Sequence, residues 1–335
     1  MDQPSPQEQM NRMLTGYWIS QALNVAAKLG IADLVKHDPR TADDLASATK
    51  THAPSLYRLL RALASVGVFT DVGQGRFSLT PLAECLRSDV PGSQRALAIM
   101  ACEEQFRAWG DLLYSVQTGK TAFDKQFGMP IFDYLSKHPE QAKVFDAAMV
   151  GVHGRETAAM LDAYDFFGIQ TLADIGGGNG SLLTTVLTKH PAMRGILYDL
   201  PGVTERAKAN LQAAGLADRC QVIGGSFFES IPTGADAYLM RHIIHDWDDD
   251  KSTKILQNIH RAMGNEARLL VVEGVILPGN DPSFGKLLDL AMLVNPGGKE
   301  RTEEEYRKLF EAGGFHLTKI VPTKGEVSVI EGRKQ

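Results

Sequence analysis

The sequence is poor in cysteine, in long apolar runs and in excess charge. Its 335 residues include three cysteines, Cys85, Cys102 and Cys220, whose spacing matches neither a metal site nor a redox pair. We interpret them as the reduced thiols of a cytoplasmic protein. No apolar stretch approaches the roughly 20 residues that cross a bilayer. The net charge of −5 gives no electrostatic reason to expect nucleic acid or an anionic membrane as partner.

The first residues, MDQPSPQEQM, also lack the basic-then-apolar pattern of a signal peptide. What is present is an ordinary globular composition, with 44% apolar and 22% charged residues. At about 150 residues per domain, a chain of this length predicts two domains.

From about Thr171 onward, short apolar runs alternate with helical patterns. This alternation predicts a doubly wound α/β sheet that is mostly parallel and covered on both faces. The last two runs are joined only by VPTKGEV, which has room for a hairpin, so the last strand is expected to be antiparallel. The seven expected strands are Thr171–Ile175, Gly195–Asp199, Arg219–Ile223, Ala235–Met240, Ala267–Glu273, Phe315–Val321 and Glu326–Ile330.

The first 100 residues have a different texture, with helical patterns at 7–28, 41–49 and 55–65. Two short strands around a Gly-rich turn follow in VGVFTDVGQGRFSLT, which is the layout of a winged helix, a common DNA-binding module. Residues 1–90 carry nine Lys or Arg and nine Asp or Glu, and the expected recognition helix offers only Arg58 and Arg61. The neutral charge favours a packing or dimerisation module over a DNA reader.

Residues 101–170 form a helical bridge that is rich in aromatic side chains. Most of these are expected in a core, and some could line an apolar pocket for a substrate. We therefore divide the chain into a winged-helix-like domain (1–100), the bridge (101–170) and a ligand-binding catalytic domain (171–335).

The stretch LADIGGGNGS places Gly176, Gly178 and Gly180 directly after the first strand of the sheet. The dinucleotide fingerprint G-x-G-x-x-G does not fit, because Ser181 stands where its third glycine would be. Asp174 just before the loop would repel a pyrophosphate but would accept a cationic ligand. Asp199 follows at the distance of a ribose-binding acid. Together these features predict S-adenosylmethionine as the ligand, with glycines that let the backbone approach it.

After the fourth strand comes LMRHIIHDWDDD, in which His245 lies at the edge where open sheets hold their ligands. A histidine there could be a base, a metal ligand or a core residue. Four acids, Asp246 and Asp248–Asp250, could supply oxygen ligands to a metal. However, acids are expected in the first turn of the helix that follows, so we predict no metal. His242 is interpreted as structural.

Methylation of a phenol requires removal of a proton whose pKa is about 10. A histidine suits this role, particularly if a carboxylate fixes its tautomer. Glu273 closes the apolar run LLVV, where a carboxylate needs a partner, and is placed to orient His245. Glu300, in NPGGKERT, could be the second such acid.

The motifs DIGGGNG, YDLPGV, HDWDDD, EGVILP and NPGGKERT, in this order, resemble those of the metal-independent small-molecule O-methyltransferases. That family comprises the plant caffeate and isoflavone type enzymes and their bacterial relatives in secondary metabolism. The resemblance covers nearly the whole chain. It implies a Rossmann-like methyltransferase sheet and an N-terminal domain that builds a homodimer.

The resemblance also implies roles for single residues. The family's base corresponds to His245, and its flanking acids to Glu273 and Glu300. The residues implied for the donor are Asp174, Gly176, Gly178, Gly180, Asp199, Leu200, Ser226, Phe227 and Arg241. Those implied for the acceptor are Asn295 and Met149.

One departure concerns the adenine site. Where the plant enzymes have GGDMF, this sequence has GGSFF, so Ser226 replaces an aspartate and Phe227 can stack on the base. Weaker donor binding is the expected consequence.

The sequence therefore predicts a homodimeric S-adenosylmethionine-dependent O-methyltransferase of hydroxylated aromatic molecules, with S-adenosylhomocysteine as product. Two alternatives stay open at this point. One is a non-methylating enzyme on the same scaffold, and the other is a ligand-responsive DNA-binding regulator. A nicotinamide enzyme ranks last because of the loop spacing.

Overall fold

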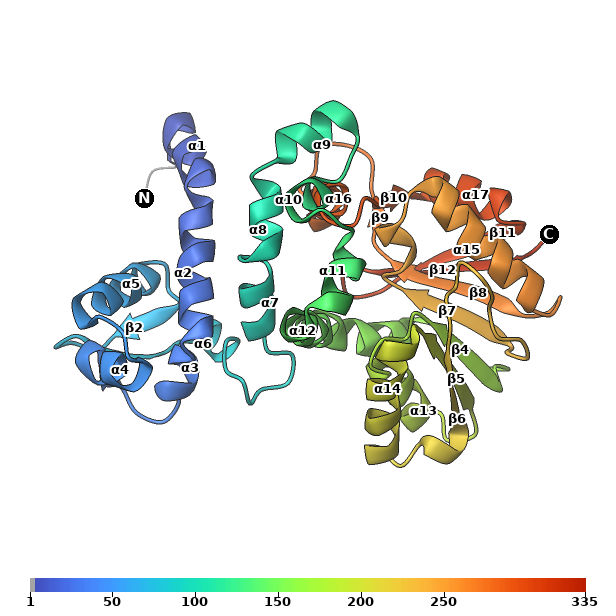
Figure 1. Cartoon of the computed structure of the whole chain (residues 1–335), viewed down its shortest axis with the longest axis horizontal. Coiled ribbons are helices and arrows are strands. Elements are labelled where there is room, and N and C mark those ends of the chain that lie inside the picture. Colours follow the sequence, from blue (N-terminus) through green and yellow to red (C-terminus); the bar gives the residue numbers. More distant parts are fainter. Residues whose placement is uncertain (1–3) are drawn as a thin grey trace. The chain divides into compact units, whose positions relative to one another are not determined.

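The computed structural model describes residues 4–335, so the first three residues of the polar N-terminal stretch lie outside it. The chain forms two units (Figure 1). The first comprises the described residues up to Arg107 together with Glu140–Val152, and the second comprises Ala108–Pro139 and His153–Gln335. Two helices, α8 (Glu104–Trp109) and α12 (Pro139–Ala163), contain residues of both units. No helix among residues 4–335 combines the length and apolar character needed to cross a bilayer.

The first unit is a small helical domain with a three-stranded antiparallel sheet in the order β1-β3-β2. Leu45, Leu60 and Phe77 are fully buried in its core. The two short strands expected after the third helical pattern are β2 and β3. The elements are α1 (Pro6–Leu14), α2 (Gly16–Lys28), α3 (Ile31–Leu34), β1 (Arg40–Thr41), α4 (Ala42–Thr49), α5 (Ala53–Ser65), β2 (Phe69–Asp71), β3 (Arg76–Leu79), α6 (Pro81–Glu84) and α7 (Arg95–Met100).

The single helix predicted for residues 7–28 is two helices, which meet at Thr15. The Thr15 hydroxyl donates a hydrogen bond to the Asn11 carbonyl, and Thr15 leaves helical geometry with φ −99° and ψ 3°. Gly16 follows and begins the second helix. Threonine and glycine are both weak helix formers, so the break lies where propensity is lowest.

The second unit contains the seven-stranded sheet, in the order β11-β12-β8-β7-β4-β5-β6. The five strands from β8 to β6 are parallel, and β12 is antiparallel to both of its neighbours. The predicted fold class is therefore confirmed, with the reversed strand between β8 and β11. The strands are β4 (Thr171–Ile175), β5 (Arg194–Asp199), β6 (Cys220–Gly224), β7 (Ala237–Arg241), β8 (Arg268–Glu273), β11 (Phe315–Pro322) and β12 (Ser328–Lys334).

Helices cover both faces of this sheet, which explains why its strands read as unbroken apolar runs. Leu270 and Val272 of β8 belong to a core with α13 and α14, whereas Leu269 and Val271 belong to a core with α15 and α17 (Figure 1). The remaining elements are α9 (Leu112–Thr118), α10 (Ala122–Phe127), α11 (Ile131–Lys137), α13 (Ser181–Lys189), α14 (Pro201–Ala213), η1 (Ala217–Arg219), η2 (Ile244–Asp246), α15 (Asp249–Ala262), β9 (Val275–Ile276), α16 (Phe284–Val294), β10 (Arg301–Thr302) and α17 (Glu303–Ala312).

The order of the strands locates the ligand site. From β4 the chain moves outward through β5 and β6, and then returns to the other side of β4 with β7. Strand order reverses at β4, and open α/β sheets bind ligands at the carboxyl ends of strands beside such a switch point. The glycine loop follows β4 and the His245 segment follows β7, so both lie at this edge.

Candidate active site

The five residues between β4 and α13 form the predicted glycine loop. Gly176, Gly178 and Gly180 have φ of +75°, +57° and +80°, in the left-handed region that residues with a Cβ atom rarely adopt. A Cβ atom at Gly176 would lie 2.3 Å from Ile243 Cδ1, whereas one at Gly178 would have no described atom within 4 Å. The loop is thus packed at its start and open at Gly178, where a ligand can approach the backbone.

Asp174, the acid before this loop, is buried, and its Oδ2 atom has no hydrogen-bond partner among residues 4–335. Burial raises the pKa of Asp174 to about 7, and the nearby Arg241 cation opposes the rise. A Cβ atom at Gly177 would lie 2.9 Å from Oδ2, so glycine leaves space beside the carboxylate. This arrangement fits a ligand that brings a positive or hydrogen-bond-donating group.

Asp199, at the end of β5, is bonded to the glycine loop. Its Oδ2 accepts a hydrogen bond from the Gly178 N–H at 2.8 Å, and its Oδ1 accepts one from the Leu200 N–H at 2.6 Å. The carboxylate predicted to bind a ribose therefore lies beside the open glycine. Its contact with the ribose, like that of Leu200, stays a prediction.

The segment expected to hold adenine follows β6 and is joined to β5, because the Gly225 N–H donates to the Asp199 carbonyl at 2.9 Å. The Ser226 hydroxyl accepts a hydrogen bond from the Phe228 N–H at 3.3 Å. The Phe227 ring packs edge-on against Phe228, with 4.9 Å between ring centroids. Ser226 and Phe227 thus lie at the same sheet edge as the loop.

Arg241 ends β7, and its guanidinium is directed at α12. It donates hydrogen bonds to the His153 carbonyl at 3.2 Å and to the Thr157 hydroxyl at 2.5 Å. Burial lowers the pKa of Arg241, and the charges of Asp174 and Glu156 oppose that effect. The predicted donor-binding cation is therefore electrostatically coupled to the acid before the glycine loop.

His245 lies in η2, the short turn after β7, and is buried. Its Nδ1 atom lies 2.6 Å from Glu300 Oε1. Because a carboxylate can only accept, this contact holds a proton on Nδ1 and leaves Nε2 as the nitrogen that can take another. Nε2 lies 3.6 Å from Asp246 Oδ1, which is beyond hydrogen-bond distance.

The surroundings of His245 are strongly negative. Burial lowers its pKa, but Asp246, Glu300 and Glu273 together raise the pKa of His245 to about 10. Burial raises the pKa of Asp246 to about 7, and the His245 cation opposes this. The ring is thus a strong proton acceptor that becomes neutral only in the alkaline range.

The structure gives Glu273 a different partner from the one that the sequence predicted. Its Oε1 accepts hydrogen bonds from three consecutive backbone N–H groups, those of residues 243, 244 and 245, at 3.0, 2.7 and 3.3 Å. Its Oε2 accepts one from the Tyr306 hydroxyl at 2.7 Å. The turn after β7 directs these N–H groups at the end of β8, so Glu273 holds the backbone and Glu300 orients the ring.

Sequence reasoning missed Arg301, which is completely buried beside the same turn. Its guanidinium donates to the carbonyls of Ile244 and Trp247, on either side of His245, at 3.2 and 3.0 Å. It also pairs with the Asp249 carboxylate at 2.9 Å. A lone arginine in a loop reads as exposed, and only its position next to Glu300 could have drawn attention to it.

A second group of titratable residues, His153, Glu156 and His242, was also missed; the sequence suggested only a structural His242. Glu156 Oε2 lies 2.9 Å from His242 Nε2, and the rings of His153 and His242 stack with centroids 4.2 Å apart and planes 13° apart. Burial lowers the pKa of His153 to about 2 and that of His242 well below its usual value. Both imidazoles are therefore neutral at physiological pH.

These three residues are the group within residues 4–335 whose ligand atoms, all within 4.8 Å of one another, could hold a metal ion. The lone pair of an imidazole nitrogen lies in the plane of its ring. Two stacked and nearly parallel rings therefore cannot direct their lone pairs at one ion unless a ring rotates. The side-chain orientations thus fit a hydrogen-bonded cluster better than a metal site.

The acids that follow His245 serve the helix after it. Asp248 caps α15, with its Oδ1 accepting from the Lys251 N–H at 2.8 Å. Asp249 pairs with Arg301 and with Lys299, the latter at 2.8 Å. These contacts agree with the capping interpretation of the acidic run.

The two residues predicted to contact the acceptor lie in different units. Asn295 follows α16 and is buried; its Nδ2 donates to the Ala291 carbonyl at 3.0 Å, and its Oδ1 has no partner in the described structure. Met149 is half-buried on the part of α12 that belongs to the first unit. The role of Met149 stays a prediction.

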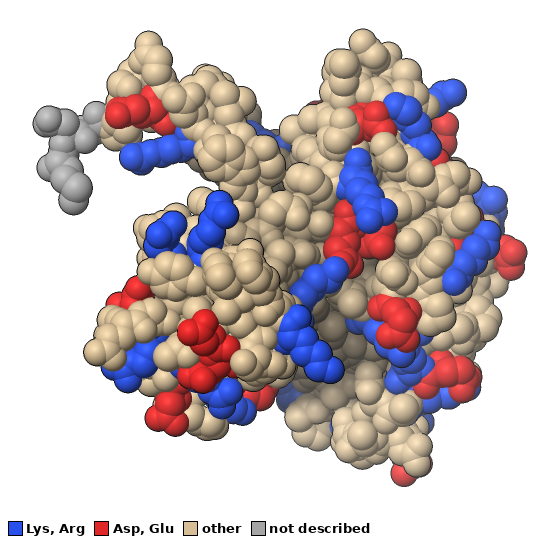
Figure 2. Space-filling model, turned by 60° about the vertical axis from the view of Figure 1, so that its left-hand side comes forward, with Lys and Arg blue, Asp and Glu red and all other residues tan. Residues whose placement is uncertain are grey.

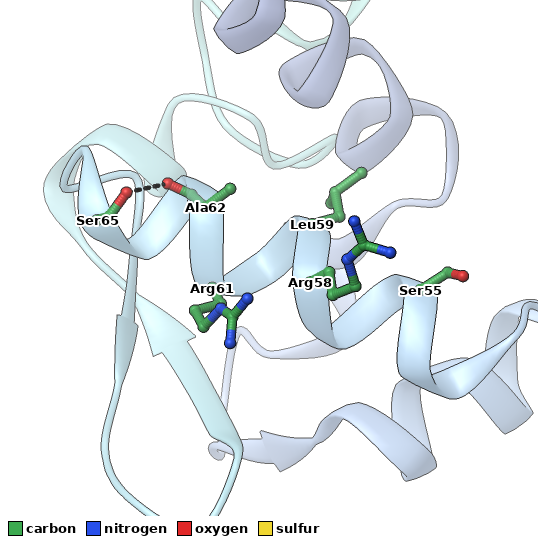
Figure 3. A pocket seen from close by; sticks show the side chains of 6 residues that line it. All are labelled: Ser55, Arg58, Leu59, Arg61, Ala62 and Ser65. Carbon is green, nitrogen blue, oxygen red and sulfur yellow. Dashed lines mark hydrogen bonds between the residues drawn. The ribbon is translucent and has the colours of Figure 1, made fainter.

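The helix expected to read DNA is α5. Arg58 and Arg61 line a shallow depression on its exposed side, together with Ser55, Leu59, Ala62 and Ser65 (Figure 3). On the face of the molecule drawn in Figure 2, basic and acidic side chains are interspersed.

Comparisons with known proteins match both parts of the chain. Residues 109–316 match the model of the O-methyltransferase domain, and residues 11–89 match that of the O-methyltransferase dimerisation domain. The chain is 49% identical to a phenazine O-methyltransferase of Lysobacter antibioticus, over 96% of this chain and 94% of that protein.

Solved structures give the same result. The mitomycin 7-O-methyltransferase MmcR superposes with a TM-score of 0.92 and 40% identity, covering 98% of each chain. The O-methyltransferase NcsB1 from neocarzinostatin biosynthesis, 34% identical over 94% of this chain and 96% of its own, has a TM-score of 0.82. Its structure contains S-adenosylmethionine and 2-hydroxy-5-methyl naphthoic acid.

Proposed function

Since this chain belongs to the O-methyltransferase family that carries an N-terminal dimerisation domain, we propose that His245 takes the proton from the acceptor hydroxyl. The activity itself is S-adenosylmethionine-dependent O-methylation of an aromatic small molecule. The contact that carries the proposal is the 2.6 Å pairing of His245 Nδ1 with Glu300. It commits Nδ1 to the carboxylate and Nε2 to the acceptor.

Bound S-adenosylmethionine supplies the methyl group, and S-adenosylhomocysteine leaves. As the O–C bond forms and the S–C bond breaks, His245 Nε2 receives the hydroxyl proton. Glu300 stabilises the resulting imidazolium, and Asp246 adds negative charge on the other side. The pKa of His245, raised to about 10, is close to that of a phenol, which is also about 10. The proton transfer between them therefore has an equilibrium constant near one.

We assign the donor site to the carboxyl ends of β4, β5 and β6. In this proposal Asp174 and Arg241 face the charged methionine end, and Gly176, Gly178 and Gly180 bring the backbone close to it. Asp199 and Leu200 contact the ribose, and Ser226 and Phe227 contact adenine. The open space at Gly178 and the unpartnered oxygen of Asp174 support this assignment.

The acceptor proposed here is a hydroxylated, fused aromatic ring system that Asn295 helps to hold. The names of the relatives support this class, since they include a phenazine methyltransferase and an enzyme with a bound naphthoic acid. The reaction needs no metal in this proposal, because the stacked rings of His153 and His242 do not converge on one ion. Prolonged dialysis against a chelator should leave turnover unchanged.

The assembly proposed is a homodimer formed through the dimerisation domain. Light scattering in solution should give twice the 36.5 kDa mass of the chain. A monomer with full activity would contradict this part of the proposal.

The test of function is transfer of an isotopically labelled methyl group to a panel of hydroxylated phenazines, naphthoates and quinones. Mass spectrometry and NMR of the product would identify the atom that carries the label. Label on a hydroxyl oxygen supports the assignment. Label only on a ring nitrogen would reassign this chain to N-methylation, an activity that one relative in Pseudomonas aeruginosa bears in its name.

A further inference from the structure

Buried polar atoms without a partner are concentrated in the candidate site. Of the seven such side-chain atoms in residues 4–335, four belong to Asp174, His242, Asn295 and Glu300. An unpaired buried polar atom destabilises the folded state, so native structures retain few of them. Asp174 has been assigned to the donor above, which leaves three atoms: His242 Nδ1, Asn295 Oδ1 and Glu300 Oε2.

All three of these atoms are hydrogen-bond acceptors. The Nδ2 atom of Asn295 donates to a backbone carbonyl, which fixes its Oδ1 as the unpaired atom. Glu300 uses Oε1 for His245 and keeps Oε2 unpaired. Such acceptors are satisfied by a group that donates, on a ligand or on an ordered water.

His242 is the decisive member of the set. Its Nε2 lies 2.9 Å from Glu156 Oε2. Burial raises the pKa of Glu156, and the charges of His153, Arg241 and His245 oppose the rise. Ionised Glu156 can only accept a hydrogen bond, so beside the carboxylate form the proton of the neutral ring is on Nε2 and Nδ1 presents a lone pair.

The ring of His242 is also held in place beside the base. It stacks on His153 on one side, and its centroid lies 4.9 Å from that of His245. Its backbone has a φ of +52°, a left-handed conformation that is costly for a residue with a Cβ atom. Backbone strain and a buried unpaired nitrogen at this half-buried residue indicate that its orientation serves a ligand.

We propose that His242 Nδ1 accepts a hydrogen bond from a second O–H or N–H group of the acceptor, adjacent to the hydroxyl that is methylated. This rests on the proposed function, which places the reacting hydroxyl at His245. The acceptor class is thereby narrowed to dihydroxy or amino-hydroxy aromatics. His242 is a specificity-determining residue in this role, with Glu156 fixing its tautomer and His153 its orientation.

The test compares 2,3-dihydroxyphenazine with 2-hydroxyphenazine, which lacks the adjacent hydroxyl group, and the Kd comparison is independent of the acidity of the reacting hydroxyl in the transfer step. Both kcat/KM and the Kd on protein loaded with S-adenosylhomocysteine are measured. The wild type should favour the dihydroxy compound by roughly 10- to 100-fold, the range expected when an otherwise unpaired buried group gains its partner.

Two variants distinguish the role of Nδ1 of the His242 ring from that of Nε2. His242→Gln can keep a donor toward Glu156 but has no acceptor in place of Nδ1. The ratio of kcat/KM for the dihydroxy compound to that for the monohydroxy compound should therefore fall to nearly one. His242→Asn can keep an oxygen near the place of Nδ1, and asparagine tolerates a positive φ, so much of the preference should return. In both variants, calorimetry should give an unchanged Kd for S-adenosylmethionine.

An undiminished preference in His242→Gln, or an absent preference in the wild type, would overturn the proposal. Equal loss of turnover on both compounds, with the binding preference intact, would also overturn it and would make His242 part of proton transfer. A preference in Kd without methyl transfer to either compound would support recognition by His242 and refute the proposed function.

Discussion

The Nδ1 atom of His245 lies 2.6 Å from Glu300 Oε1, although the two residues are 55 positions apart in the chain. One lies in the turn after β7, and the other lies just before the short strand β10. The pairing orients a buried imidazole whose other nitrogen faces no hydrogen-bonding partner within 3.5 Å in the described structure. The role of this pairing in catalysis can be tested by replacing either Glu300 or His245.

Replacement of Glu300 by glutamine should lower kcat by roughly 10²- to 10⁴-fold, because the amide can hold the wrong tautomer and does not stabilise an imidazolium. The Kd for S-adenosylmethionine should change little, since Glu300 has no part in the donor site. Rapid-quench measurement of labelled methyl transfer, beside calorimetry of donor binding, separates the two effects. A fall in donor affinity as large as the fall in kcat would contradict this assignment.

The pH dependence of turnover follows from the charges around the base. His245 acts only when Nε2 is unprotonated, so a pKa raised to about 10 should place the rising limb of kcat/KM in the alkaline range. Removing negative charge lowers that pKa, and Asp246→Asn should therefore move the limb toward lower pH. If the titrating group were the acceptor hydroxyl, the rising limb of kcat/KM would shift when the acceptor is changed and would stay in place in Asp246→Asn. A limb near pH 6.5 in the wild type would refute the raised pKa.

Arg301 should act on the position of His245 and not on its protonation. Arg301→Ala removes the donors to the carbonyls of Ile244 and Trp247 and should lower both kcat and thermal stability. Arg301→Lys keeps the positive charge but lacks the planar guanidinium that reaches both carbonyls. We therefore expect its kcat to lie between those of Arg301→Ala and the wild type, with an unchanged pH profile. Added guanidinium at low concentration should restore part of the activity of Arg301→Ala. A shifted pH profile in the lysine variant would point to an electrostatic role instead.

The glycine loop offers a matched pair of variants. Gly178 and Gly215 have φ of +57° and +70°, and a Cβ atom at either would have no described atom within 4 Å. Alanine at either position should therefore cost similar stability, of about 1 kcal/mol. Only Gly178→Ala should raise the Kd for S-adenosylmethionine, by tenfold or more, because the ligand approaches that residue. Equal donor affinities in the two variants would remove the loop from the donor site.

Much of the fold could be predicted, because its signals are local. The strand Thr171–Ile175 was predicted residue for residue, since an apolar run ends in glycines there. The last strand was predicted to end at Ile330 but continues to Lys334. Its additional residues are mostly polar. The buried Glu331 accepts hydrogen bonds from Tyr164, far away in sequence, and from Thr318 of the neighbouring strand.

The same distinction explains the candidate site. His245, Glu300 and the glycines lie in motifs that their spacing makes recognisable. Arg301 and Glu156 do not, because their partners come from other elements of the sheet edge and from α12. The different roles of Glu273 and Glu300 depend on where the N–H groups of one turn are directed. Sequence spacing carries no information on that direction.

The most direct test of the account is a single-turnover measurement of labelled methyl transfer by the wild type and by His245→Gln. Both are saturated with S-adenosylmethionine and presented with the acceptor that the panel identifies. The account predicts that the wild-type rate rises through the alkaline range as His245 loses its proton, and that the variant is at least 10²-fold slower there while the acceptor is not yet ionised. The donor Kd should be unchanged. A variant that transfers methyl at the wild-type rate in the alkaline range, where His245 of the wild type has lost its proton, would show that the proton leaves without His245.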